Sequence, residues 1–190
     1  TLRRGSGAAQ KKSAGLMEQW RKLGGKPELQ GMFSVSFYNG VRDGGAAVTS
    51  MLFMYDTLGM SPKTVGLYLL TGIGAMLVCN RPAAMLSDRY ASQRRLIMLP
   101  AFFGPPTMFA CQSLCTSVEP YWALGVLSHC LVALQFATIS PFIIEHAGKP
   151  ENRPQAFALH TTSTDVGRVL GATSMGLLAG AVSVPAAMQA

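Results

Sequence analysis

Four charged side chains lie inside segments that are otherwise apolar. Arg42 and Asp43 are neighbours near the middle of one such segment, and Asp165 and Arg168 lie within another. In a lipid bilayer each charge costs roughly 2.5–3.5 kcal/mol on insertion scales, so charges persist there only where they face a cavity or a partner. The four residues are therefore candidates for binding a solute or an ion, with ion pairing between helices as the structural alternative.

The spacing of these residues indicates how they could meet. Asn39 precedes Arg42 by three residues and Asp43 by four, which places the three side chains on one side of a helix. Asp165 and Arg168 are one helical turn apart and can pair locally. They can instead reach across to Arg42 or Asp43, which would form a network of four charges.

Two uncharged polar residues, His129 and Gln135, lie in a further apolar segment and are candidates for lining a cavity. A single membrane histidine can equally serve as a hydrogen-bonding group in packing. No histidine cluster, Asp-x-x-Asp pair or Ser/His arrangement in the sequence supports a membrane-embedded enzyme. No phosphate-binding glycine loop followed by Lys-Ser/Thr is present either. The sequence thus predicts no catalytic residues, no metal site and no cofactor.

The composition places the chain in the membrane class. Charged residues make up 13% of the 190 residues and hydrophobic residues 49%, whereas a soluble domain carries about 25% charged residues. The net charge of +7 does not indicate nucleic-acid binding, because the basic residues cluster in the N-terminal tail and in alternate loops. The four cysteines lie in apolar segments without disulfide or zinc spacing and are predicted to be small buried side chains.

Five apolar segments predict an all-α integral membrane helical bundle with about five transmembrane helices. Each segment reaches the ~20 residues that cross a hydrocarbon core. Residues 31–190 form the predicted bundle, with spans at about 31–56, 61–86, 95–117, 120–146 and 154–184. Basic loops alternate along the chain, which places the N-terminus on the cytoplasmic side or its organellar equivalent.

Residues 1–30 are the only polar region, with seven Lys or Arg residues against two Glu. Leu16, Met17, Trp20 and Leu23 recur at helical spacing, which predicts a short amphipathic helix on the membrane surface. A solvated cytoplasmic tail or interdomain linker and the end of an organelle transit peptide are the alternatives.

The loop between the second and third segments carries a recognisable pattern. It resembles the signature that joins the second and third helices of each six-helix repeat in the major facilitator superfamily. The residues that fit are Leu86, Ser87, Asp88, Arg89, Arg94 and Arg95, whereas Ala84 and Ala91 stand where the family prefers glycine. The sequence from Glu151 to Ala156 is similar to the usual approach to the fifth helix of a repeat.

The resemblance implies one incomplete six-helix repeat of a major facilitator-type fold. It implies a secondary active or facilitative transporter that moves a small solute across the lipid bilayer by alternating access, as a symporter or antiporter coupled to protons or sodium, or down the solute's own gradient. The basic segment before the first helix favours helices 7–11 of the carrier over an N-terminal half. The chain begins without Met and stops after an apolar segment, so we expect a fragment that works with the other half of the transporter.

Residue roles also follow from the resemblance. The first helix of a repeat lines the central cavity, so Arg42 would hold an anionic group and Asp43 would be a protonation site, with Asp165 as the second candidate. Asp88 and Arg89 would belong to a cytoplasmic gating loop, in which Arg94 and Arg95 contact lipid phosphates or set the topology. The alternative class is a non-transporting structural subunit of a membrane complex that derives from a carrier.

Overall fold

The computed structural model describes residues 27–182 and 184–189, and every regular element in this part of the chain is a helix. The predicted all-α class is therefore confirmed. The amphipathic helix predicted between Leu16 and Leu23 lies outside the described residues.

Five long helices form the body of the structure: α2 (Pro27–Leu52), α3 (Pro62–Arg89), α4 (Arg94–Gln112), α5 (Val118–Ala147) and α6 (Arg153–Ala181). A π-helical turn η1 (Phe53–Thr57) prolongs α2, the 3₁₀ turns η2 (Ala91–Gln93) and η3 (Pro150–Asn152) precede α4 and α6, and a short α7 (Val184–Gln189) follows α6.

The helix boundaries follow from local chemistry. Ser61 caps α3, because its side-chain oxygen accepts a hydrogen bond from the backbone N–H of Thr64 at 3.2 Å. Proline in the first turn suits the starts of α2, α3 and α6, since its missing N–H has no partner there. The third predicted span, α4, ends at Gln112 rather than near residue 117. The backbone N–H groups of Leu114 and Cys115 donate to carbonyls three residues back, which tightens the chain into turns.

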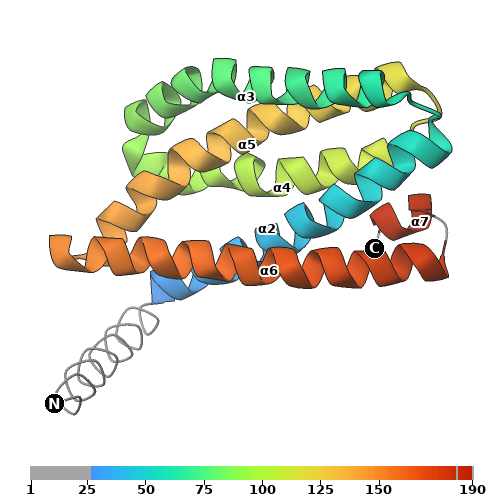
Figure 1. Cartoon of the computed structure of the whole chain (residues 1–190). Coiled ribbons are helices and arrows are strands. Elements are labelled where there is room, and N and C mark those ends of the chain that lie inside the picture. Colours follow the sequence, from blue (N-terminus) through green and yellow to red (C-terminus); the bar gives the residue numbers. More distant parts are fainter. Residues whose placement is uncertain (1–26, 183, 190) are drawn as a thin grey trace, which may run out of the picture.

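The helices form two groups that differ in how closely they pack. Helix α6 lies along α2, whereas α5 packs against both α3 and α4, and contacts between the two groups are much sparser. Figure 1 shows α6 along one side of the bundle, with α3, α4 and α5 on the other. The pairs α2–α6 and α3–α5 both run parallel, since residues that meet across each pair increase in number together.

Four glycines bring α2 and α6 into backbone contact. A Cβ atom on Gly40 or Gly44 would collide with the carbonyl of Thr164 or Arg168, and one on Gly167 or Gly171 would collide with a carbonyl of α2. Gly167 and Gly171 thus give α6 a small-residue face toward α2. A Cβ on Gly176, further along α6, would meet nothing within 4 Å. The matching Gly40-x-x-x-Gly44 on α2 is the other half of this contact.

Two apolar clusters close the bundle at its two ends. Residues near the start of α2 and the end of α5, among them Met32 and Ile143, form one cluster. Residues around η1 and the start of α5, among them Phe53 and Tyr121, form the other. Arg42 and Asp43 lie between Met32 of the first cluster and Phe53 of the second along the chain.

Among the described helices, α3 and α5 are long and apolar enough to cross a membrane by length and hydropathy alone. Helices α2 and α6 carry their charges internally, and α4 begins with two arginines and contains three prolines. Hydropathy therefore supports two of the roughly five predicted spans, and the full count stays a prediction.

The glycine contact predicts a position-specific effect on stability. Gly171→Ala would force a methyl group against the carbonyl of Val41, so we expect the free energy of unfolding to fall by about 1–3 kcal/mol. Gly176→Ala on the same helix is the matched control and should be neutral or stabilising by about 0.5–1 kcal/mol. Thermal unfolding in detergent measures both, and equal stability of the two variants would contradict the backbone contact.

Candidate functional site

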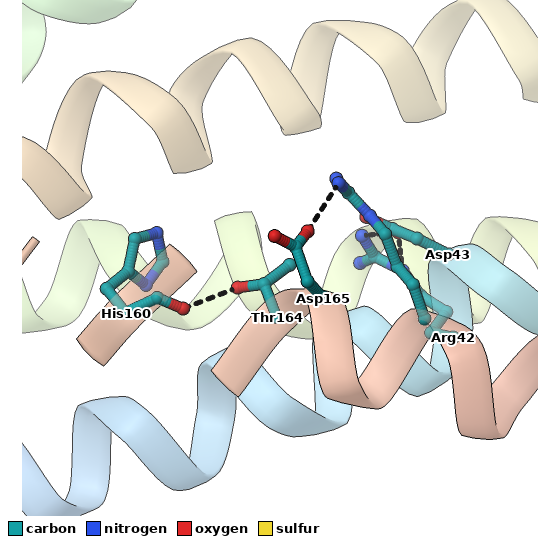
Figure 2. A network of polar contacts seen from close by, with 6 residues as sticks. Arg42, Asp43, His160, Thr164 and Asp165 are labelled. Atoms are coloured by element: carbon teal, nitrogen blue, oxygen red, sulfur yellow. Dashed lines mark hydrogen bonds and ion pairs between the residues drawn. The ribbon is translucent and has the colours of Figure 1, made fainter. Parts of the chain in front are cut away.

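The four predicted intramembrane charges do meet, across α2 and α6. Arg42 donates to the Oδ1 atom of Asp43 from Nη2 at 2.5 Å and from Nε at 2.9 Å. Arg168 lies 3.7 Å from Asp43 Oδ2 and 3.4 Å from Asp165 Oδ1, so it pairs both locally and across the helix interface. We call Arg42, Asp43, Asp165 and Arg168 the charge network; Figure 2 shows its α2 and α6 members converging.

The charge network is electrically balanced but unequally buried. Its two arginines and two aspartates sum to zero net charge, which lowers the cost of placing them between apolar clusters. The side chain of Arg42 is only 10% exposed, and its Nη1 atom has no hydrogen-bond partner among the described residues. Asp165 and Arg168 are instead exposed on the surface of α6.

A cavity of about 220 Å³ opens beside Arg42 and Asp43. Its walls come from four helices and combine charged, polar and aromatic groups: Arg42, Asp43, Ala46, Ser50, Tyr68, Pro105, Phe109, Gln112, Ser128, His129 and Val132. We call it the mid-bundle cavity. The arrangement can hold a small polar group, with Arg42 as a cationic donor and Asp43 as an acceptor or proton carrier.

His129 is in the predicted place, at the wall of the mid-bundle cavity. Its Nδ1 atom lies 2.8 Å from the carbonyl oxygen of Gly125, and its ring occupies the space that a Cβ on Gly72 would need. The imidazole therefore both packs α5 against α3 and borders the cavity, so the two interpretations of this residue are compatible.

Two cavity residues, Gln112 and Tyr68, were not predicted from the sequence. The Nε2 atom of Gln112 donates to Tyr68 Oη at 3.1 Å and to the carbonyl oxygen of Tyr121 at 2.9 Å, which joins α3, α4 and α5. The sequence signal that could have identified Gln112 is its position as an isolated amide side chain near the end of a segment without charges.

Asn39 and Gln135 do not belong to the mid-bundle cavity. Both are buried, and neither is among the residues that line it. Asn39 makes no hydrogen bond to Arg42 or Asp43, and its side-chain polar atoms have no hydrogen-bond partner among the described residues. It is buried on α2, and its part in the three-residue patch stays a prediction.

A second polar link joins α2 to α6 next to the charge network. His160 Nδ1 lies 2.6 Å from Ser36 Oγ, and the hydroxyl of Thr164 donates to the carbonyl oxygen of His160 at 3.0 Å. His160, Thr164 and Asp165 follow one another along α6 in Figure 2. Because Ser36 also donates to the carbonyl oxygen of Met32 at 2.7 Å, its one proton is used, and His160 Nδ1 must act as the donor.

Comparison with known proteins identifies the family of the chain. A family model described as Major Facilitator Superfamily matches residues 32–190. The chain belongs to the major facilitator superfamily. It is therefore a multi-pass integral membrane protein of a family of transporters, as the loop pattern predicted. No curated protein and no solved structure matches it significantly.

The superfamily loop signature contains two buried members, Ser87 and Arg94. Arg94 is buried, donates from Nε to Ser87 Oγ at 3.2 Å and forms an ion pair through Nη1 with Glu145 Oε1. The expectation that Arg94 contacts lipid phosphates is thus wrong, because its guanidinium pairs with Glu145 instead. The pair ties the start of α4 to the ends of α3 and α5, because the turn η2 directs Arg94 inward.

The other signature residues lie on the surface of the described structure. Asp88, Arg89 and Arg95 are exposed, and the guanidinium of Arg89 lies 5.8 Å from the ring centroid of Tyr90. Their predicted gating and topological roles stay predictions. Among the described residues, no group of three or more His, Cys, Asp or Glu side chains could hold a metal ion.

The two arginines of the signature are predicted to differ in their effect on stability. Arg94→Ala removes the partner of a buried hydroxyl and of a carboxylate, so we expect the free energy of unfolding to fall by about 1–3 kcal/mol. Arg95→Ala, one residue on and exposed, should change it by no more than about 0.5 kcal/mol. A double-mutant cycle with Glu145→Ala, followed by thermal unfolding in detergent, measures the coupling. Zero coupling would contradict the ion pair.

Proposed function

We propose that the chain forms helices 7–11 of a secondary transporter and moves a small anionic solute by alternating access. The observation that carries the proposal is the mid-bundle cavity with Arg42 and Asp43 in its wall. Transporter sites lie near the bilayer midplane between helices, and intramembrane charges mark such pathways. Here the charges lie between the two apolar clusters, as a site at the midplane requires.

Arg42 is the group best suited to bind the solute. Two of its three nitrogens already bond to Asp43, while the buried Nη1 atom has no partner among the described residues. A buried donor without a partner is costly, at about 1–3 kcal/mol. A carboxylate or phosphate oxygen of the solute would satisfy it, and Tyr68 and His129 offer further polar contacts from facing helices.

Asp43 is the group best suited to couple transport to protons. It bridges Arg42 and Arg168, so one proton on its carboxylate would weaken both ion pairs and leave the charge network with a net charge of +1. An anionic solute then restores the balance. This reciprocal arrangement favours movement of proton and anion together, with sodium as the alternative coupling ion.

The exposed charges of α6 support a partner on that side. Asp165 and Arg168 are about half exposed at the middle of their helix, where contact with lipid tails would be unfavourable. The other half of the carrier, packed against α6 across a central pathway, would supply water or polar groups. The basic tail and basic alternate loops place the N-terminus on the cytoplasmic side or its organellar equivalent.

The non-transporting subunit remains the second candidate, and one observation favours it. All four members of the charge network are paired within the chain, as expected of charges that only fix packing. The mid-bundle cavity argues against this alternative, because static packing needs no polar cavity beside the ion pair.

Uptake by proteoliposomes that contain the full-length protein tests the proposal. With a panel of labelled small carboxylates and phosphate, we expect uptake of at least one that an inward proton gradient accelerates. Arg42→Gln should abolish uptake because the anion loses its cationic donor. Asp43→Asn should keep exchange but lose stimulation by the gradient, because its side chain no longer titrates.

Lys63→Gln and Asp56→Asn are the matched controls, since both residues are exposed and neither lines the mid-bundle cavity. Both should retain uptake. Unaltered uptake by Arg42→Gln would contradict the role of Arg42, and a folded protein that carries no member of the panel would favour the non-transporting subunit.

A further inference from the structure

Two cysteines that are far apart in the sequence meet between α3 and α5. The thiol of Cys79 donates to the sulfur of Cys130, and the two Sγ atoms are 3.0 Å apart. Both side chains are partly exposed, and both thiols are free. The prediction that the cysteines are merely small buried side chains is therefore wrong for this pair.

The surrounding contacts hold the two helices in this register. The ring of His129, the residue before Cys130, packs against Gly72 on α3. Trp122 on α5 donates through Nε1 to Thr71 Oγ1 on α3 at 2.8 Å. Because these contacts fix α3 against α5, the proximity of the two sulfurs is a property of the helix interface.

We propose that Cys79 and Cys130 form a site of reversible thiol oxidation, in which a disulfide ties α3 to α5. A disulfide has an S–S length of about 2.05 Å, so the sulfur atoms need to approach by only about 1 Å. Small changes in side-chain torsion supply that movement. This inference is independent of the proposed transport of an anionic solute.

The oxidant must be small and uncharged to reach a pair between apolar helices, and hydrogen peroxide has these properties. One sulfur, as the thiolate, attacks a peroxide oxygen, so that an S–O bond forms, the O–O bond breaks and water leaves after proton transfer. The second sulfur then attacks the sulfenic sulfur, the S–O bond breaks and a second water leaves. Two electrons pass from the thiols to the peroxide, and a dithiol reverses the reaction.

The disulfide would lie beside the mid-bundle cavity. Tyr68 on α3 and His129 on α5 both line that cavity, and the cross-link would join their two helices close to His129. Oxidation would therefore fix one wall of the cavity, while the α2–α6 pair, which carries the charge network, would stay free of the link.

The other two cysteines provide an internal comparison. Cys111 is exposed, and the thiol of Cys115 lies 3.6 Å from the carbonyl oxygen of Cys111. Cys111 should react with the oxidant first and so reports that peroxide has reached the protein.

The test is peptide mapping by mass spectrometry of the full-length protein in membranes, before and after treatment with hydrogen peroxide. We expect the peptides that contain Cys79 and Cys130 to appear joined after oxidation and separate after dithiothreitol. The variant Cys111→Ser/Cys115→Ser should retain the joined peptides, and Cys79→Ser and Cys130→Ser should each lose them.

A matched variant tests the geometry without removing a thiol. In Cys130→Ser/Leu131→Cys the thiol moves one residue to the side of α5 that contacts Gly104 on α4, so the link should be lost. The proposal is overturned if Cys79 and Cys130 stay free while Cys111 is oxidised, or if the displaced thiol links equally well.

Discussion

The backbone contact between α2 and α6 determines where the charges of this protein lie. Lipid tails provide no hydrophobic drive between membrane helices, so close packing through small residues holds such pairs together. Gly40 and Gly44 on one helix and Gly167 and Gly171 on the other remove the side chains that would separate the two backbones. Asp43 and Arg168 each adjoin one of these glycines, and the contact therefore brings them within ion-pair distance.

The charge network and the cavity follow from this contact and from the apolar clusters above and below it. Charges in a bilayer are tolerated when they pair, and here each aspartate has at least one arginine partner. Pairing does not exhaust the donors of Arg42, whose buried Nη1 atom has no hydrogen-bond partner among the described residues. The same arrangement thus explains how the charges are kept and how one proton or one anion could rearrange them.

Much of this architecture can be predicted from the sequence, because the length of the apolar segments, the charges inside them and the loop signature can be recognised from the order of residues alone. These features predicted the five long helices and indicated that Asp43 and Arg168 can meet. The face of a membrane helix is harder to predict, since apolar side chains point both to lipid and to protein and the periodicity is weak. The partners of Gln112, His160 and Cys79 were therefore missed.

Arg94 illustrates a different limit of prediction from the sequence. A basic residue in a basic loop is usually solvated or bound to lipid headgroups, and nothing local distinguishes Arg94 from Arg95. Its burial depends on Glu145, which is distant in sequence and reaches it only because α4 and α5 pack together. Long-range pairs of this type can be recognised only when the neighbours of each helix are known.

We propose above all that the charge network borders a pathway with alternating access. The most direct test replaces Asp43 by Cys in full-length protein that lacks the four native cysteines, and probes it with an impermeant thiol reagent from each side of the membrane. Leu77→Cys, on the exposed apolar surface of α3, is the control and should stay unlabelled from both sides. We expect labelling at position 43 to switch sides with the solute or proton gradient, whereas complete protection from both sides would show that the charges are static ion pairs.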